Sequence, residues 1–313
     1  MGLISKIFGR FTGSTAPSNT QPRIKVFDGH GQELEIERNV YREKVLPVQF
    51  EEAGNDPEKL YSAIVLALGD EFFAEAVAPA RRFLGIDQGS ERATVVLGIA
   101  LMRSGRLDEA RQIFELYIDE QGESGAVLTN LAKVYASRGE EDRAESTLWR
   151  SLNVDPNQEN GLEWWGALHG ERGGSSAFLN AMIQAASIAG SYRPQLWIAK
   201  AYLEAGRTEE ALGMYREILP LLADDGNALM MLTGDLGSHG RIQEAVLMVR
   251  PSYDPERHGP LAGINLVYGL IDMERYREAH ELLDELDKLG RPDLMITLAE
   301  LRASIPEGLA RNT

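Results

Sequence analysis

The chain has 313 residues, of which 43% are hydrophobic and 26% charged, and a formal net charge of −16. This charge argues against nucleic acid as a partner, because affinity for nucleic acid depends largely on lysines and arginines that contact phosphates. Cysteine is absent, which excludes disulfides and thiolate metal ligands, and no apolar run approaches the roughly 20 residues that span a bilayer.

Residues 1–22 are predicted to form an amphipathic N-terminal segment followed by a flexible linker. Apolar side chains recur at helical spacing beside Lys6 and Arg10, at Leu3, Ile4, Ile7, Phe8 and Phe11. This pattern allows weak contact with a membrane surface, and a disordered start is the alternative. The segment lacks the apolar centre of a signal peptide. We therefore expect a cytoplasmic protein, with peripheral membrane association as an alternative that co-sedimentation with anionic vesicles would test.

Residues 23–56 are predicted to form a small module of a hairpin and a helix. Ile24 and Val26 alternate with polar residues, and Leu34 and Ile36 do so again after a turn sequence at 28–31. Alternation on both sides of a glycine-containing turn is typical of a β-hairpin. A short helix is expected over 39–45.

An internal repeat dominates the remaining sequence. Its clearest mark is a series of glycines separated by 34, 34, 33 and 34 residues, namely Gly105, Gly139, Gly173, Gly206 and Gly240. An alanine follows most of them five residues later, and the stretch 273–279 matches without the glycine. A fixed period of this length indicates a stack of similar structural units.

The unit at 125–158 shows the physical basis of the repeat. Leu128, Leu131, Ala132 and Tyr135 lie on one face of a helix. Gly139 can take the left-handed conformation that ends a helix, and the acidic residues that follow suit the start of the next one. Each unit is therefore predicted to be a helical hairpin.

The same unit resembles the tetratricopeptide repeat family at its signature positions, which are occupied by Leu128, Leu131, Ala132, Tyr135, Gly139, Ala144, Leu148 and Pro156. The resemblance implies an all-α fold: a right-handed superhelical solenoid of about seven helical hairpins over 57–305. A capping helix is expected near its end, and a tail at 306–313.

The resemblance also implies a concave groove, lined by the first helix of each repeat, that binds a peptide or helix of another protein. The residues predicted to bind this partner are Asn130, Lys133, Trp164, Arg193, Trp197, Lys200 and Asn265. Trp164 and Trp197 could instead pack in the core, and this alternative stays open. The family's dicarboxylate clamp for chaperone C-termini is incomplete, because Val95 and Ile99 stand where that clamp needs polar residues.

The sequence offers little support for catalysis or for a bound cofactor. The five histidines are scattered without a metal-binding spacing, and no phosphate-binding loop or nucleophile elbow is present. We therefore expect a non-enzymatic adaptor without metal or cofactor, and self-association remains open. The alternative is a membrane-associated scaffold or assembly factor that is recruited through residues 1–11.

Overall fold

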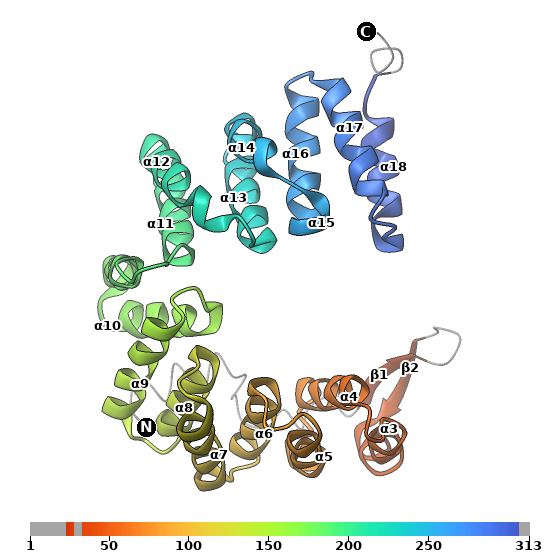
Figure 1. The fold of residues 1–313 in the computed structure, drawn as a ribbon, viewed down its shortest axis with the longest axis vertical. Coiled ribbons are helices and arrows are strands. Elements are labelled where there is room, and N and C mark those ends of the chain that lie inside the picture. Colours follow the sequence, from red (N-terminus) through yellow and green to blue (C-terminus); the bar gives the residue numbers. More distant parts are fainter. Residues whose placement is uncertain (1–22, 28–32, 307–313) are drawn as a thin grey trace. The chain divides into compact units, whose positions relative to one another are not determined.

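The computed structural model describes residues 23–27 and 33–306, and Figure 1 shows their helices and strands. The described part is helical except for one small sheet. The amphipathic residues Leu3, Ile4, Ile7, Phe8 and Phe11 lie outside it, as does the end of the chain after residue 306. None of the described helices combines the length and the apolar character needed to cross a membrane.

The first module begins with an antiparallel pair of strands, β1 (Arg23–Phe27) and β2 (Glu33–Glu37). The register opposes Ile24 to Ile36, and Lys25 to Glu35 on the other face of the sheet. Apolar pairs therefore share one face and opposite charges share the other, which specifies the register. The predicted hairpin is confirmed, but the helical stretch after it is longer than expected and comprises α2 (Arg38–Val40), a π-helical segment η1 (Tyr41–Val45) and α3 (Leu46–Glu52).

Helical hairpins follow from residue 57 onward. Aspartate or serine caps the first helix in each of the first three hairpins, where the Asp56, Ser90 and Ser124 side chains accept backbone N–H bonds. These three hairpins consist of α4 (Pro57–Gly69) with α5 (Phe73–Ile86), α6 (Glu91–Arg103) with α7 (Leu107–Gln121), and α8 (Gly125–Ser137) with α9 (Glu141–Val154).

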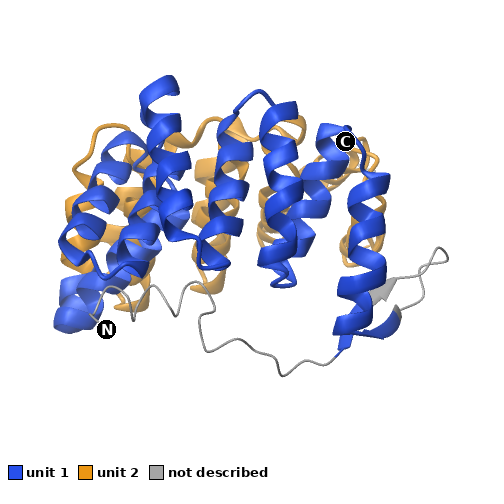
Figure 2. Ribbon diagram, turned by 90° about the horizontal axis from the view of Figure 1, so that it is seen from below, with its two compact units in different colours: residues 1–178 blue, residues 179–313 orange. Residues whose placement is uncertain are grey.

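The fourth hairpin is assigned as one long helix, α10 (Glu159–Ala186), but two residues within it depart from helical geometry. Gly173 and Gly174 both have non-helical torsions, with φ of −145° and 72°. The chain divides into two compact units soon after this break, residues 1–178 (unit 1) and 179–313 (unit 2), which are coloured separately in Figure 2. The sequence predicted one solenoid over 57–305, and the glycine pair lies just before the boundary between the two units.

Unit 2 continues the pattern with three more hairpins and a final helix. Its elements are α11 (Arg193–Glu204), α12 (Thr208–Ile218), η2 (Leu219–Leu222), α13 (Gly226–Ser238), α14 (Ile242–Val249), η3 (Arg250–Ser252), α15 (Pro255–His258), α16 (Pro260–Asp272), α17 (Tyr276–Asp287), η4 (Pro292–Leu294) and α18 (Met295–Ala303). Their apolar faces form one core that runs from Leu196 to Ile305. The helical-hairpin repeat and the capping helix predicted from the sequence are confirmed.

A left-handed residue joins the two helices of most hairpins. Gly105, Gly139, Gly206 and Gly240 have φ between 70° and 82°. In the fourth hairpin the left-handed residue is Gly174, one position after the Gly173 of the repeated glycine series. In the last hairpin Glu274 takes the place of glycine, with φ of 57°. A side chain in this conformation costs free energy because its Cβ approaches the following carbonyl oxygen.

Replacing Glu274 by glycine is therefore expected to stabilise the chain. We predict that Glu274→Gly raises the free energy of unfolding by up to about 1 kcal/mol, because it removes the strain of a left-handed side-chain-bearing residue. The gain is limited because glycine loses more backbone entropy on folding than glutamate does. Thermal and urea denaturation measure the change. Gly206→Ala is the control: a Cβ there meets nothing within 4 Å, so its predicted loss of stability comes from the backbone alone. Destabilisation by Glu274→Gly would contradict this account.

Candidate functional site

The first helices of unit 1 carry mostly buried side chains at the positions predicted to face a partner. Asn130 and Trp164, which stand at equivalent places in successive repeats, are 7% and 1% exposed, and Val96 at the same place in the preceding repeat is 5% exposed. Trp164 is among the largest fully buried side chains of the chain. The structure thus corrects the expectation that Trp164 faces an open groove and agrees with the core alternative for this residue.

Asn130 is buried but has unused hydrogen-bonding capacity. Its Nδ2 donates to the carbonyl oxygen of Ala126 at 2.9 Å. Within the described part of the chain, nothing donates a hydrogen bond to its Oδ1. A buried acceptor without a donor costs free energy, and an N–H group of a bound molecule could satisfy it.

Lys133, on the same helix α8, is half-buried beside charged neighbours. Burial lowers the pKa of its ammonium group, Glu163 opposes this shift, and Arg103 adds to it. Water therefore solvates the Lys133 ammonium poorly, and an anionic or carbonyl group placed next to it would stabilise the charged form.

In unit 2 the first helices of the repeats leave more of their side chains exposed to solvent. Trp197 on α11 is partly buried and packs against the core of this unit. Arg193, one turn earlier, is only 7% exposed; it donates to Asp225 Oδ2 at 3.4 Å and lies 3.6 Å from Met231 Sδ. The expectation of an open positive charge at Arg193 is therefore corrected, because this guanidinium links α11 to the start of α13.

Asp225 is held by several donors. Burial acts to raise its pKa, but hydrogen bonds from Tyr192 and the Ala228 backbone N–H, with the charge of Arg193, keep the pKa of Asp225 below the ordinary value. Tyr192 Oη lies 2.6 Å from Asp225 Oδ2. This group is a structural cluster that fixes the entry of α13.

In the same unit, Lys200 is exposed and Asn265 is half-buried. The Lys200 ammonium is exposed and 3.8 Å from Asp235 Oδ1, and burial raises the pKa of Asp235 while Lys200 opposes that shift. Asn265 on α16 donates through Nδ2 to Thr233 Oγ1 on α13 at 3.0 Å. We call the surface of α11, α13 and α16 that carries Trp197, Lys200, Met231, Asn265 and Tyr268 the unit 2 face.

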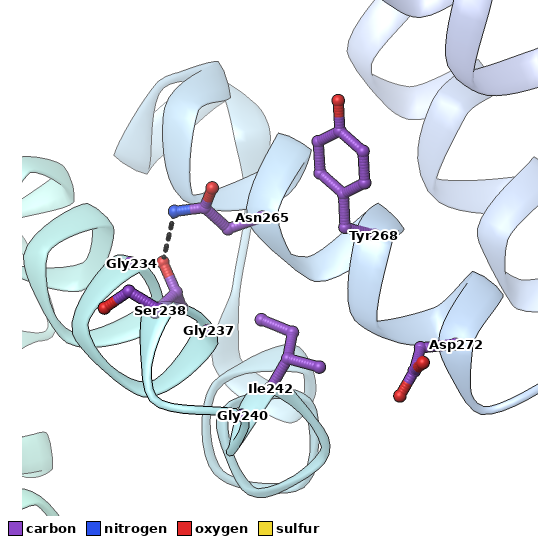
Figure 3. A pocket seen from close by; sticks show the side chains of 9 residues that line it. Gly234, Gly237, Ser238, Gly240, Ile242, Asn265, Tyr268 and Asp272 are labelled. Carbon is purple, nitrogen blue, oxygen red and sulfur yellow. Dashed lines mark hydrogen bonds between the residues drawn. The ribbon is translucent and has the colours of Figure 1, made fainter.

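A pocket opens in the unit 2 face between α13 and α16 (Figure 3). Its volume is about 660 Å³. Tyr268 stands beside it with 56% of its surface exposed. The residues that line it are Thr233, Gly234, Gly237, Ser238, Gly240, Ile242, Asn265, Tyr268 and Asp272.

Sequence reasoning identified only part of this pocket. Asn265 was predicted as a partner-binding residue, whereas Tyr268, Ser238 and Asp272 were not. The available signal was their spacing: Asn265, Tyr268 and Asp272 follow one another at three- and four-residue steps and so share one side of α16. Asn130 and Lys133 belong to unit 1 and are not among the lining residues of this pocket.

No group of three or more histidine, aspartate or glutamate side chains within residues 23–27 and 33–306 is arranged to hold a metal ion. The lining residues of the pocket offer hydrogen-bonding groups, an aromatic ring and a carboxylate.

Comparison with known families matches the repeated hairpins directly. Two family models, both described as tetratricopeptide repeat, match residues 101–163 and residues 195–219. The chain is a tetratricopeptide repeat protein. The first matched stretch includes α8 and α9, and the second covers most of α11 and α12, so each unit contains at least part of a recognised repeat.

Curated relatives match a quarter to a third of this tetratricopeptide repeat chain. A Photosystem I assembly protein Ycf3 of Prochlorococcus marinus (strain NATL1A) is 28% identical over 109 residues, which are 33% of this chain and 63% of the relative. The same protein of strain MIT 9211 is 34% identical over 82 residues, or 25% of this chain and 47% of the relative. The chain thus spans about half to two thirds of the length of these relatives.

Among solved structures, a thermophilic tetratricopeptide repeat protein of Thermus thermophilus is similar. It shares 17% sequence identity, covers 57% of this chain and 98% of its own, and has a TM-score of 0.36.

The environment of Lys133 leads to a prediction about its titration. Its pKa is expected below the ordinary lysine value of about 10.4, and Glu163→Gln should lower it further because the opposing acid is removed. Because the pKa of Lys133 is lower in the folded state, burial of its charge destabilises the fold fully at neutral pH. This destabilisation decreases as the pH rises through the pKa of the folded state. NMR titration of the lysine ¹³Cε resonances measures both values.

Glu120→Gln provides the matched control, because it removes the same charge from an exposed position on α7. This variant should leave the pKa of Lys133 unchanged. An ordinary or raised Lys133 pKa in the parent chain would contradict the assigned burial.

Proposed function

We propose that the chain is a non-enzymatic adaptor that binds a peptide or helix of another protein across the unit 2 face. Tetratricopeptide hairpins support a role in protein–protein interaction, and the position of the binding surface is our inference. The observation that carries it is the pocket between α13 and α16, flanked by exposed Tyr268 and by the amide of Asn265.

The side chains of the unit 2 face suit protein recognition. Trp197 and Tyr268 offer large, rigid contact surfaces, which commonly supply much of the energy of an interface. Lys200 and Asn265 add polar groups that can orient a backbone or a side chain. Trp164 and Arg193 are left out of the proposed contacts because both are buried.

In unit 1, Asn130 and Lys133 are proposed as a separate polar contact. The unused acceptor of Asn130 and the poorly solvated ammonium of Lys133 would each gain from the N–H and C=O groups of a bound backbone. We assign these two residues a supporting role, since Asn130 is only 7% exposed.

A narrower role in the assembly of a protein complex has weaker support. The curated relatives are assembly proteins by name, but the similarity covers 82 to 109 residues. Recruitment to a membrane by Leu3, Ile4, Ile7, Phe8 and Phe11 stays a prediction from sequence. Whether the captured protein is a subunit of a larger complex can be read from the experiment below.

The test compares proteins recovered from native lysate by the intact chain and by a Lys200→Ala, Tyr268→Ala double variant. Both side chains are exposed, so the variant should fold normally. We expect recovery of the true partner to fall about tenfold, since loss of a contact residue at an interface centre commonly costs more than 1 kcal/mol. Quantitative mass spectrometry of the recovered proteins measures the change.

The matched control is a Leu247→Ala, Lys288→Ala variant. It removes one exposed apolar side chain from α14 and one exposed lysine from the end of α17. Full recovery by this control, with loss only in the first variant, supports binding at the unit 2 face. Equal recovery by all three proteins would rule out this surface.

A further inference from the structure

Lys133 is a half-buried cation without an ionic partner. Its side chain belongs to α8 in unit 1, and its ammonium group makes no hydrogen bond or ion pair with any residue in the ranges 23–27 and 33–306. A charge that is removed from water costs free energy, which a counter-ion normally offsets in a folded protein. The ammonium of Lys133 is therefore available to bind an anion.

Two charged side chains from other helices of unit 1 act on Lys133 in opposite senses. Glu163 on α10 favours its charged form, and Arg103 at the end of α6 disfavours it. Glu163 forms no ion pair with a described residue, so it does not neutralise Lys133 at contact distance. The Arg103 guanidinium lies over the ring of Phe73, 4.4 Å from its centroid, and Glu71 also acts on its charge. Arg103 therefore adds positive potential at Lys133 while its own contacts lie elsewhere.

One turn before Lys133, Asn130 offers a hydrogen-bond acceptor that also lacks a partner. Its side chain is 7% exposed, and no described residue donates to its Oδ1. Residues three apart on a helix share one side, with Cβ atoms about 5–6 Å apart. Neighbouring residues of an extended segment are separated by about 3.5 Å. One bound segment can therefore place a backbone N–H at Asn130 and an adjacent side chain at Lys133.

The charges around Lys133 favour a carboxylate as the bound anion. A carbonyl oxygen would leave the ammonium charge uncompensated, whereas a hydrogen bond between two ions is about twice as strong as a neutral one. A phosphate group carries about −1.5 to −2 charges, so Glu163 and the net charge of −16 would repel it more strongly than a carboxylate. A single negative charge matches the single ammonium group.

From this arrangement we propose that Lys133 binds an acidic side chain, glutamate or aspartate, of the partner protein. The carboxylate accepts a hydrogen bond from Lys133 Nζ, and a backbone N–H of the same segment donates to Asn130 Oδ1. The site differs from the dicarboxylate clamp of the family, two of whose positions hold Val95 and Ile99 in this chain. This inference rests on the proposed adaptor function, since it names the chemistry of the partner at its unit 1 contact.

The probe is the peptide acetyl-Ala-Ala-Glu-Ala-Ala-amide, titrated into the full chain labelled with ¹³C at lysine Cε. The chain has seven lysines, so the Lys133 resonance can be resolved. We expect a saturable shift of this resonance and a rise in the pKa of Lys133, because a bound carboxylate favours the charged form. The matched glutamine peptide lacks the charge and should bind about fivefold more weakly. Inorganic phosphate should also bind more weakly than the glutamate peptide.

Two variants and a matched control complete the test, with the backbone amide shifts of α8 as the measure of binding. Lys133→Met should weaken binding of the glutamate peptide about fivefold. It should also raise the midpoint of thermal unfolding, because an unpaired half-buried charge is removed from the fold. Glu163→Gln should strengthen binding about threefold, since an acid near the bound carboxylate repels it. Lys288→Met removes the same charge from an exposed position at the end of α17 and should leave binding unchanged.

The proposal is overturned if the glutamate peptide leaves the Lys133 resonance unchanged, if the glutamine peptide or phosphate binds as well, or if Lys288→Met weakens binding as much as Lys133→Met. A lower thermal midpoint of Lys133→Met would also overturn it, because it would mark Lys133 as a structural residue. These results are separate from the capture experiment. If the glutamate peptide fails while the Lys200→Ala, Tyr268→Ala variant still loses its partner, the adaptor function stands and only the assignment of an acidic side chain falls.

Discussion

The close packing of the two helices in each repeat is the constraint on which the rest of this structure depends. A left-handed residue ends the first helix, and a fully buried alanine follows in the second, at Ala110, Ala144, Ala211, Ala245 and Ala279. Small residues allow the helices to approach, so that their larger apolar side chains fill the space between neighbouring repeats. Because one side of each first helix is used in this packing, its other side can carry recognition chemistry.

The repeat itself could be predicted because it depends on local sequence. Glycine is favoured wherever φ is positive, so the regular spacing of the glycines locates the turns between helices. The exceptions are also physical: Gly173 is adjacent to a second glycine that takes the left-handed conformation instead, and Glu274 adopts that conformation despite its side chain. The hairpin at 23–37 was equally predictable, because alternation of apolar and charged residues fixes which strand faces meet.

The surface was harder to predict because exposure depends on neighbouring elements. Trp164 and Trp197 occupy the same position of successive repeats, yet Trp164 is buried and Trp197 is partly open. Arg193 appeared to be a free charge, but Asp225, 32 residues later, accepts its hydrogen bond. The pocket combines Ser238 and Asp272 from different helices with glycines that leave space, and such a combination is visible only once the helices are placed side by side.

The central claim is that the unit 2 face binds another protein, and site-specific photocrosslinking tests it most directly. A photoreactive phenylalanine analogue would replace either Tyr268, which is 56% exposed beside the pocket, or Leu247, which is 63% exposed on α14. The account predicts that irradiation in native lysate links a specific protein to position 268 and not to position 247. Adducts that form equally at both positions, or only at position 247, would contradict it.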